Sequence, residues 1–141
     1  MVTSQLDLFT FTSDDTPALP LARLGNNPAA YDPQDCHWIT AEPMPGYVLR
    51  LGFARDTDGW RMAAGYYFPD IGSIGPVFVR SNVYTSYQEA RRAGLDRLRL
   101  MVNGLQLSFS ISQDKAERLR RAIHELTQAA QCGLSLFKDA A

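Results

Sequence analysis

The chain has 141 residues, of which 45% are apolar, and a formal net charge of −1 with two cysteines and two histidines. This length and apolar content suffice for one hydrophobic core but not for two. No apolar run is long enough for a membrane span, and the first residues lack a secretory signal, so we expect a cytoplasmic protein without membrane contact. Cys36 and Cys132 are far apart and no metal-ligand spacing is present, which predicts neither a disulfide framework nor a metal or other cofactor.

A five-residue motif stands near the N-terminus: Gln5, Leu6, Asp7, Leu8 and Phe9. It resembles the peptide with which bacterial DNA polymerases, repair factors and mobile-element proteins bind the replication sliding clamp. In such a peptide Leu8 and Phe9 can fill an apolar pocket while the Gln5 amide makes hydrogen bonds that set the register. The resemblance implies that residues 1–12 are a clamp-binding peptide of about micromolar affinity. The alternative is an ordinary N-terminal β-strand, because Leu6 and Leu8 would share one face.

The next segment is rich in proline. Residues 13–46 hold six of the eight prolines, mixed with Gly, Asn, Asp and Ala. Such a stretch has too little apolar surface to order itself fully and predicts a tether, although Trp38 and Ile39 can pin part of it to a core. Residues 47–141 are then predicted to form the folded domain.

The first half of this domain has the patterns of strands. Residues 47–55 alternate between apolar and polar, residues 56–59 form a Gly-containing hairpin turn, and residues 60–68 return as a second strand. After a loop at residues 70–75, residues 76–80 predict a short third strand. Strands joined by tight turns run antiparallel, which leaves one face of the sheet free to take helices.

Two amphipathic helices are predicted to follow. Ser86 is a good N-cap for the first, which Asn103 and Gly104 are expected to stop. Residues 105–111 alternate and suggest a fourth strand, and a second helix starts after Ser112. The predicted fold class is α+β, with an antiparallel sheet of three to four strands and two helices packed on one of its faces.

A poorer copy of the clamp motif lies near the C-terminus. Leu134, Leu136 and Phe137 match its apolar positions, but Gly133 stands where the glutamine belongs. These three residues are a candidate second protein-binding site, which would add avidity on a clamp ring. The competing interpretation is that Gly133 caps a helix and the apolar residues pack on the core.

The charge is unevenly distributed. Residues 1–79 carry nine acidic and four basic side chains, whereas residues 80–141 carry six acidic and ten basic. Candidates for contact with nucleic acid are therefore four arginines of the predicted helices: Arg91, Arg92, Arg118 and Arg121. Acidic side chains recur one turn away, so a solvated, ion-paired surface competes with this interpretation.

The predicted sheet carries five aromatic residues: Trp60, Tyr66, Tyr67, Phe68 and Phe78. If they are exposed, their rings can stack on bases, and if the helices cover them, they belong to the hydrophobic core. The order of strands and helix, with Tyr67–Asp70 and Ser86–Ala90, resembles that of double-stranded-RNA-binding domains and of HicB-type antitoxin domains. The likeness is topological, because the chain lacks the basic helix start of the first and the regular loop of the second.

No catalytic motif is present: neither a nucleophile with its base, nor paired carboxylates, nor a phosphate loop. The sequence therefore predicts a non-enzymatic accessory or inhibitory protein. It would dock on the bacterial sliding clamp and act in DNA replication, repair or mobile-element maintenance, with its domain presented to DNA or to a second replication or repair protein. The alternative is a HicB-like or other regulatory, nucleic-acid-binding domain whose N-terminal segment is a structural strand.

Overall fold

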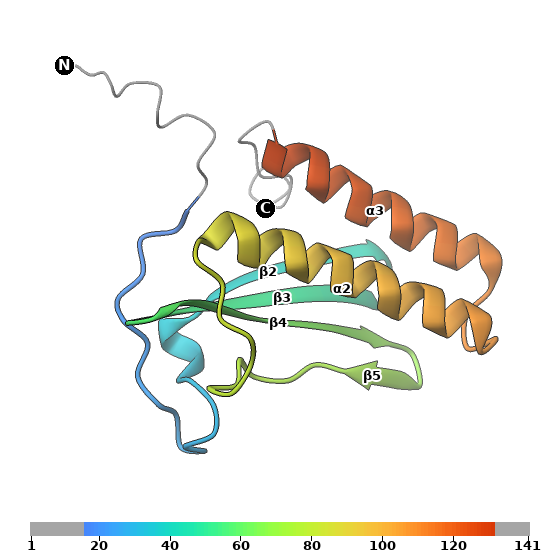
Figure 1. Ribbon diagram of the computed structural model, residues 1–141. Coiled ribbons are helices and arrows are strands. Elements are labelled where there is room, and N and C mark those ends of the chain that lie inside the picture. The colour runs from blue at the N-terminus through green and yellow to red at the C-terminus, as the bar shows by residue number, and fades with distance from the viewer. Residues whose placement is uncertain (1–15, 132–141) are drawn as a thin grey trace.

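The computed structural model describes residues 16–131. Four antiparallel strands form one sheet in the order β2, β3, β4, β5, and two helices cover one of its faces (Figure 1). The elements are η1 (Pro33–Asp35), β2 (His37–Met44), β3 (Tyr47–Asp56), β4 (Gly59–Phe68), β5 (Ile71–Ser73), α2 (Tyr87–Leu107) and α3 (Gln113–Gln131). The predicted α+β class is thereby confirmed. Within residues 16–131, neither helix combines the length and apolar character needed to cross a bilayer.

The β3–β4 hairpin forms the centre of the sheet because alternating apolar residues flank a tight turn. Leu49, Leu51 and Phe53 of β3 face the helices and are at most 2% exposed. Asp56 pairs with Gly59 across the turn, and the φ of Gly59 is +136°, a conformation that L side chains rarely adopt. The predicted hairpin is confirmed.

Local capping chemistry starts α2 at the predicted residue. The Ser86 hydroxyl accepts a hydrogen bond from the backbone N–H of Glu89. The Glu89 carboxylate in turn accepts bonds from the backbone N–H and the hydroxyl of Thr85. These bonds satisfy donors that a helix start leaves unpaired, and a negative charge near the positive end of the helix dipole adds to the effect.

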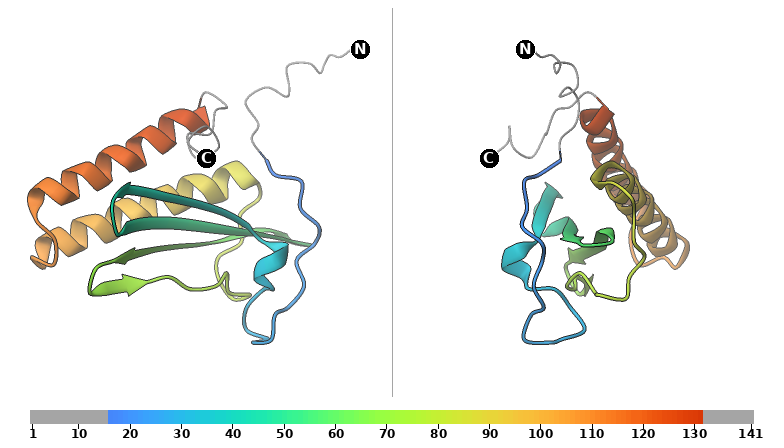
Figure 2. Two further views of the ribbon diagram at one scale, coloured as in Figure 1. Left: turned by 180° about the vertical axis from the view of Figure 1, so that it is seen from behind. Right: turned by 60° about the vertical axis from the view of Figure 1, so that its left-hand side comes forward.

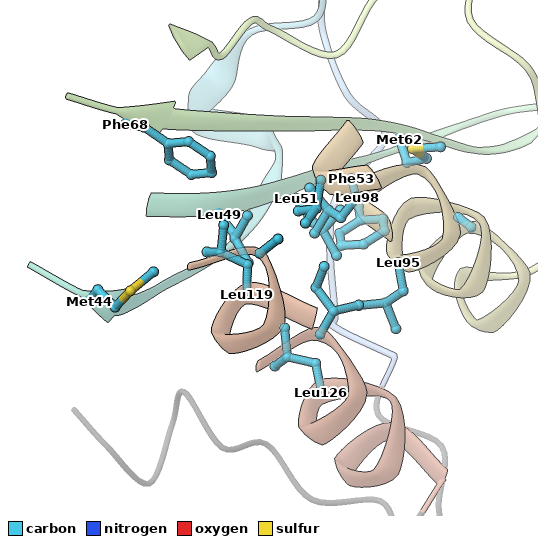
Figure 3. Close-up of a cluster of buried hydrophobic side chains, with 14 of the residues drawn as sticks. Met44, Leu49, Leu51, Phe53, Met62, Phe68, Leu95, Leu98, Leu119 and Leu126 are labelled. Atoms are coloured by element: carbon cyan, nitrogen blue, oxygen red, sulfur yellow. The ribbon is translucent and has the colours of Figure 1, made fainter. Parts of the chain in front are cut away.

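The hydrophobic core lies between the sheet and the helices (Figure 3). Leu119 and Leu126 of α3 and Leu98 of α2 meet the strand side chains there, and each is at most 3% exposed. Gly94 brings α2 close to β3, since a Cβ at that position would lie 2.8 Å from Cδ2 of Leu51. The absence of a side chain at Gly94 therefore sets how tightly the helix packs on the sheet.

The folded unit begins earlier than the expected boundary at residue 47. The edge strand β2 comes from the segment 13–46 that was predicted to be a tether, and within that segment Tyr31 is 2% exposed and Asp35 is 6% exposed. The Asp35 carboxylate accepts two hydrogen bonds from the Arg23 guanidinium and a third from the backbone N–H of Arg23. Composition alone underestimated the order of this segment, because its few apolar residues bury against a sheet that other parts of the chain supply.

The end of the first helix also differs from expectation. α2 continues through Asn103 and Gly104 to Leu107, so residues 105–111 complete a helix and a turn instead of forming a fourth strand. Leu105 packs against the core from the helix, and that contact favours continuation over the local stop signal.

The fourth strand lies elsewhere. It is β5, inside the predicted loop 70–75, and it pairs with the end of β4 through Phe68 and Ile71. Residues 76–80 contribute only an isolated bridge between Ala30 and Phe78. The prediction of a strand at residues 76–80 is therefore wrong, although the sheet has four strands, which agrees with the predicted three to four.

Candidate functional site

The sheet face opposite the helices is partly covered. Residues 16–36 pack on it near the β3–β4 turn, so that the sheet lies between the helices and this segment (Figure 2). A small second core holds the segment in place: Tyr31, Cys36, Ala54 and Val77. Burial raises the pKa of the Cys36 thiol to about 11, which keeps the thiol protonated and unreactive at neutral pH.

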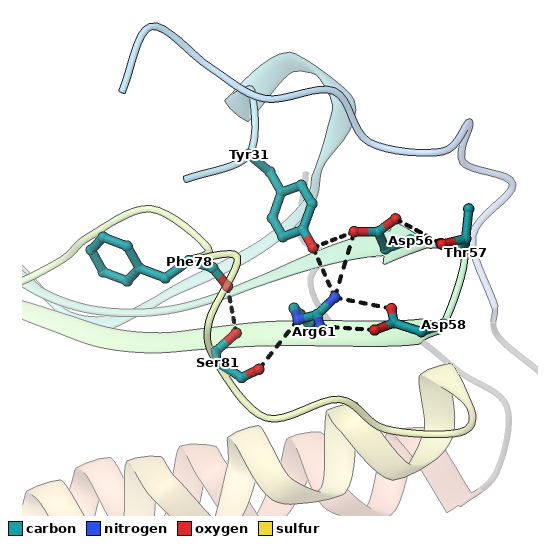
Figure 4. Close-up of polar contacts among 7 residues, drawn as sticks. All are labelled: Tyr31, Asp56, Thr57, Asp58, Arg61, Phe78 and Ser81. Carbon is teal, nitrogen blue, oxygen red and sulfur yellow. Dashed lines mark hydrogen bonds and ion pairs between the residues drawn. The ribbon is translucent and has the colours of Figure 1, made fainter. Parts of the chain in front are cut away.

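A polar cluster joins the covering segment to the hairpin (Figure 4). The Tyr31 hydroxyl donates a 2.6 Å hydrogen bond to Asp56, and the Arg61 guanidinium donates a 2.8 Å bond to the Tyr31 oxygen. The same guanidinium bonds both Asp58 oxygens at 3.0 Å and donates to the Ser81 carbonyl. We call these residues the Tyr31–Arg61 cluster.

Electrostatics support a structural role for the Tyr31–Arg61 cluster. Burial, reinforced by the bond to Asp56, raises the pKa of Tyr31 to about 12. The hydrogen bond from Tyr31 in turn holds the pKa of Asp56 below its usual value. Tyr31 therefore stays a neutral donor and Asp56 a charged acceptor. Arg61 pairs with both Asp56 and Asp58, so the cluster joins the β3–β4 turn to the covering segment through Tyr31.

The other half of this sheet face is open and carries three side chains suited to binding. Trp38 of β2, Arg50 of β3 and Tyr67 of β4 all point away from the helices, as the strand register requires. The guanidinium carbon of Arg50 lies 4.0 Å from the centre of the Trp38 ring, and Tyr67 is 62% exposed. Nε of Arg50 is buried and has no hydrogen-bond partner in the described part of the chain. We call Trp38, Arg50 and Tyr67 the sheet-face site.

Glycines let the two aromatic rings lie flat on the sheet. A Cβ at Gly52 would lie 2.2 Å from Cζ3 of Trp38, and one at Gly72 would lie 2.8 Å from Cδ1 of Tyr67. Trp38 is held further by a 3.0 Å hydrogen bond from its Nε1 to the Pro33 carbonyl. The Trp38 ring is thus enclosed between Gly52 and the Arg50 guanidinium. The sheet-face site presents this arginine beside the exposed Tyr67 ring, an arrangement that can hold an anion by charge and a planar group by stacking.

No family model, curated protein or solved structure matches this chain. Within residues 16–131, no three His, Cys, Asp or Glu side chains are grouped so as to hold a metal ion.

One of the four arginines proposed for nucleic-acid contact is buried and the other three are exposed. Arg91 is only 2% exposed, and its guanidinium donates a 3.4 Å hydrogen bond to the buried Tyr87 hydroxyl, so it cannot reach a nucleic acid. Arg118 lies 3.4 Å from Asp114 in the expected ion pair. Arg92 and Arg121 are exposed, but on different helices. Arg91 was assigned to the surface by its charge, although its spacing from Tyr87 and Gly94 places it on the buried face of α2.

The aromatic candidates divide in the same way. Trp60 and Phe68 are buried in the core and Tyr66 is partly buried, whereas Tyr67 and Phe78 are exposed. Only Tyr67 therefore joins the sheet-face site. The sequence did not reveal Trp38 and Arg50 as its partners, because their proximity depends on the β2–β3 register and β2 lies in the segment predicted as a tether.

The clamp-like motif Gln5–Phe9 lies outside the described residues. The C-terminal candidates Leu134, Leu136 and Phe137 lie outside them as well. Both sites stay predictions.

Proposed function

We propose that this protein is a non-enzymatic accessory or inhibitory factor of the bacterial cytoplasm that docks on the sliding clamp through Gln5–Phe9. The observation that carries the proposal is the motif itself, in which a register-setting amide precedes two adjacent apolar anchors. Once docked, the protein would act in DNA replication, repair or mobile-element maintenance by presenting its domain to DNA or to a second protein.

The position of the motif relative to the folded unit supports a role at the clamp surface. All strands of the described sheet come from residues 37–73, so this sheet is explained without residues 5–9. Residues 10–15 separate the motif from the first described residue, and even a fully extended chain of that length spans only about 20 Å. The domain would therefore stay close beside an occupied clamp pocket, where it can block or recruit other clamp partners.

Calorimetry with a purified bacterial sliding clamp tests this function. We expect the full chain to bind at about micromolar affinity, and a Gln5→Ala/Phe9→Ala variant to lose at least about 100-fold, because one buried anchor and the directional amide are removed together. A Leu21→Ala/Leu24→Ala variant, altered at exposed residues of the folded unit, is the matched control and should bind like the wild type. If the wild-type protein does not bind the clamp, residues 5–9 are not a clamp-binding motif.

The sheet-face site favours a second function, binding of single-stranded nucleic acid by the domain. The exposed Tyr67 ring provides a stacking surface for a base, and the Arg50 guanidinium, stacked on Trp38, provides a cation for the phosphate backbone. A regulatory, nucleic-acid-binding domain would work through such a surface with or without the clamp motif.

Fluorescence anisotropy with a labelled single-stranded oligonucleotide tests this second function. We expect Tyr67→Ala to weaken binding about 10-fold or more, since stacking on one aromatic residue contributes roughly 1–3 kcal/mol. Phe78→Ala removes a comparably exposed ring from outside the site and should leave affinity unchanged. Equal affinities for both variants, or none for the wild type, would exclude the sheet face as the binding surface.

A further inference from the structure

We propose that residues 5–12 pair with the open edge of β2 as a further antiparallel strand, and that the clamp motif is not free to bind a clamp while it is paired. The consequence for clamp binding rests on the proposed function. The pairing itself is argued from the folded unit and can be measured without a clamp.

The outer edge of β2 is unpaired in the described chain. β2 lies at one edge of the sheet and pairs with β3 alone (Figure 1). Trp60 exchanges backbone hydrogen bonds with Tyr84 on the side of β4 away from β3. Because backbone groups point alternately to the two sides of a strand, the register then directs those of Trp38, Thr40 and Glu42 away from β3. No backbone bond within residues 16–131 reaches these groups, and such an edge is a template for another strand. We call these three the open-edge residues.

The covering segment brings the N-terminal part of the chain to this edge. The Ala22 N–H donates a 2.8 Å hydrogen bond to the Arg55 carbonyl, and Nε of Arg55 donates a 2.9 Å bond to the Leu19 carbonyl. Arg55 lies two residues beyond the β3 partner of His37, so Ala22 lies in line with β2, just ahead of its first residue. The residues between the proposed strand and Leu19 have to cross only one strand spacing, about 5 Å, to lay that strand antiparallel along β2.

The length and pattern of residues 5–12 fit this edge. The segment has eight residues, as β2 has, and its leucines alternate with other residues as a strand requires. Ile39 and Ala41 point toward the helices and are only partly buried. If Leu8 lies opposite Ile39, then Leu6 lies opposite Ala41. The two leucines would therefore extend the apolar layer beneath α3.

Charge favours the same register on the other face of the sheet. Asp7 would then lie opposite Thr40, whose partner on β3 is Arg50. The guanidinium of Arg50 lies over Trp38, and its Nε is buried without a hydrogen-bond partner in the described chain. A carboxylate beside Thr40 would therefore approach a cation that has a polar atom left to satisfy.

The covalent connection favours this segment over a separate molecule. A short link holds its end beside the edge at an effective concentration of about millimolar. A second copy of the chain, or a free peptide, would have to supply the same contacts at its much lower concentration in solution. A segment that is paired about ten times as often as it is free would raise the Kd for a clamp about 10-fold.

Amide hydrogen exchange of the full chain, followed by NMR without a clamp, tests the pairing. We expect the amides of the open-edge residues to exchange at least about 10-fold more slowly than in an Asp7→Pro/Phe9→Pro variant, which lacks two of the donors aimed at β2. Thr3→Pro/Asp14→Pro places two prolines outside the segment and should leave the exchange as in the wild type.

Equal exchange in the wild type and in Asp7→Pro/Phe9→Pro would overturn the proposal. Slow exchange that depends on protein concentration would overturn it as well, because it would assign the edge to a second copy.

Calorimetry with a purified clamp tests the consequence. Thr40→Pro removes an outward N–H from an edge strand without altering the motif, so its Kd should be about 10-fold lower than that of the wild type. Thr40→Val keeps the N–H and should bind as the wild type does. A Kd unchanged by Thr40→Pro would show that the pairing does not restrict the motif. If none of the three proteins binds while the difference in exchange persists, the clamp function is refuted and the pairing is not.

Discussion

Replacing Arg61 by methionine is expected to lower the free energy of unfolding by about 2–3 kcal/mol. The Arg61 side chain is only 12% exposed and contacts Asp56, Asp58, Tyr31 and the Ser81 carbonyl together. Methionine keeps much of the apolar stem but leaves two carboxylates close together without a counter-charge. Because Asp58 is 54% exposed, water screens part of the repulsion, and the loss stays below that for a fully buried pair.

Urea denaturation of the wild-type protein and of the Arg61→Met variant measures this effect. Arg118→Met is the matched control, because Arg118 pairs with Asp114 at the surface, where the loss should be below about 1 kcal/mol. A double-mutant cycle that combines Arg61→Met with Tyr31→Phe should give an interaction energy of at least about 0.5 kcal/mol in the free energy of unfolding, because Tyr31 and Arg61 share a hydrogen bond. Equal losses for Arg61→Met and Arg118→Met would mean that the Tyr31–Arg61 cluster does not hold the covering segment to the sheet.

Replacing Gly94 by valine is expected to destabilise the protein by about 3 kcal/mol. A Cβ alone would lie 2.8 Å from Cδ2 of Leu51, a side chain that is 2% exposed and enclosed by the core. The two further methyl groups of valine would push α2 away from β3. The same substitution at Gly104 meets open space, so its effect should be a gain below about 0.5 kcal/mol from helix propensity.

Thermal and urea unfolding of Gly94→Val and Gly104→Val provide this comparison within one helix. A Gly94→Val protein as stable as the wild type would contradict the close packing of α2 on β3.

Local signals were sufficient for the parts of the fold that neighbouring residues build. The alternation in residues 47–55 and 60–68 and the Asp-Thr-Asp-Gly turn predicted the central hairpin. The side chains of Thr85, Ser86 and Glu89 predicted the start of α2. In each case the interacting groups are a few residues apart in sequence, so the pattern and the structure report the same contact.

Distant contacts explain the errors. β2 follows a proline-rich segment and is a strand because residues 37–41 pair with residues 49–53. α2 passes Asn103 and Gly104 because Leu105 gains a place in the core. Arg91 was assigned to the surface by its charge, whereas the helix rotation that packs its neighbours carries it inward. The first two outcomes depend on residues far away in the chain, whereas the burial of Arg91 had a local signal in its spacing from Tyr87 and Gly94, which its charge outweighed.

The sequence by itself determined the α+β class, the hairpin, the two amphipathic helices and the motif Gln5–Phe9, because periodicity, turn chemistry and short motifs are local properties. Only the tertiary structure decided that residues 16–46 belong to the folded unit, and that Trp38, Arg50 and Tyr67 share an open sheet face. It alone showed that no contact in the described chain explains the glycine at position 104 or the left-handed backbone conformation of Phe109. Strand register and burial depend on partners far away in sequence, and only the folded chain brings those partners together.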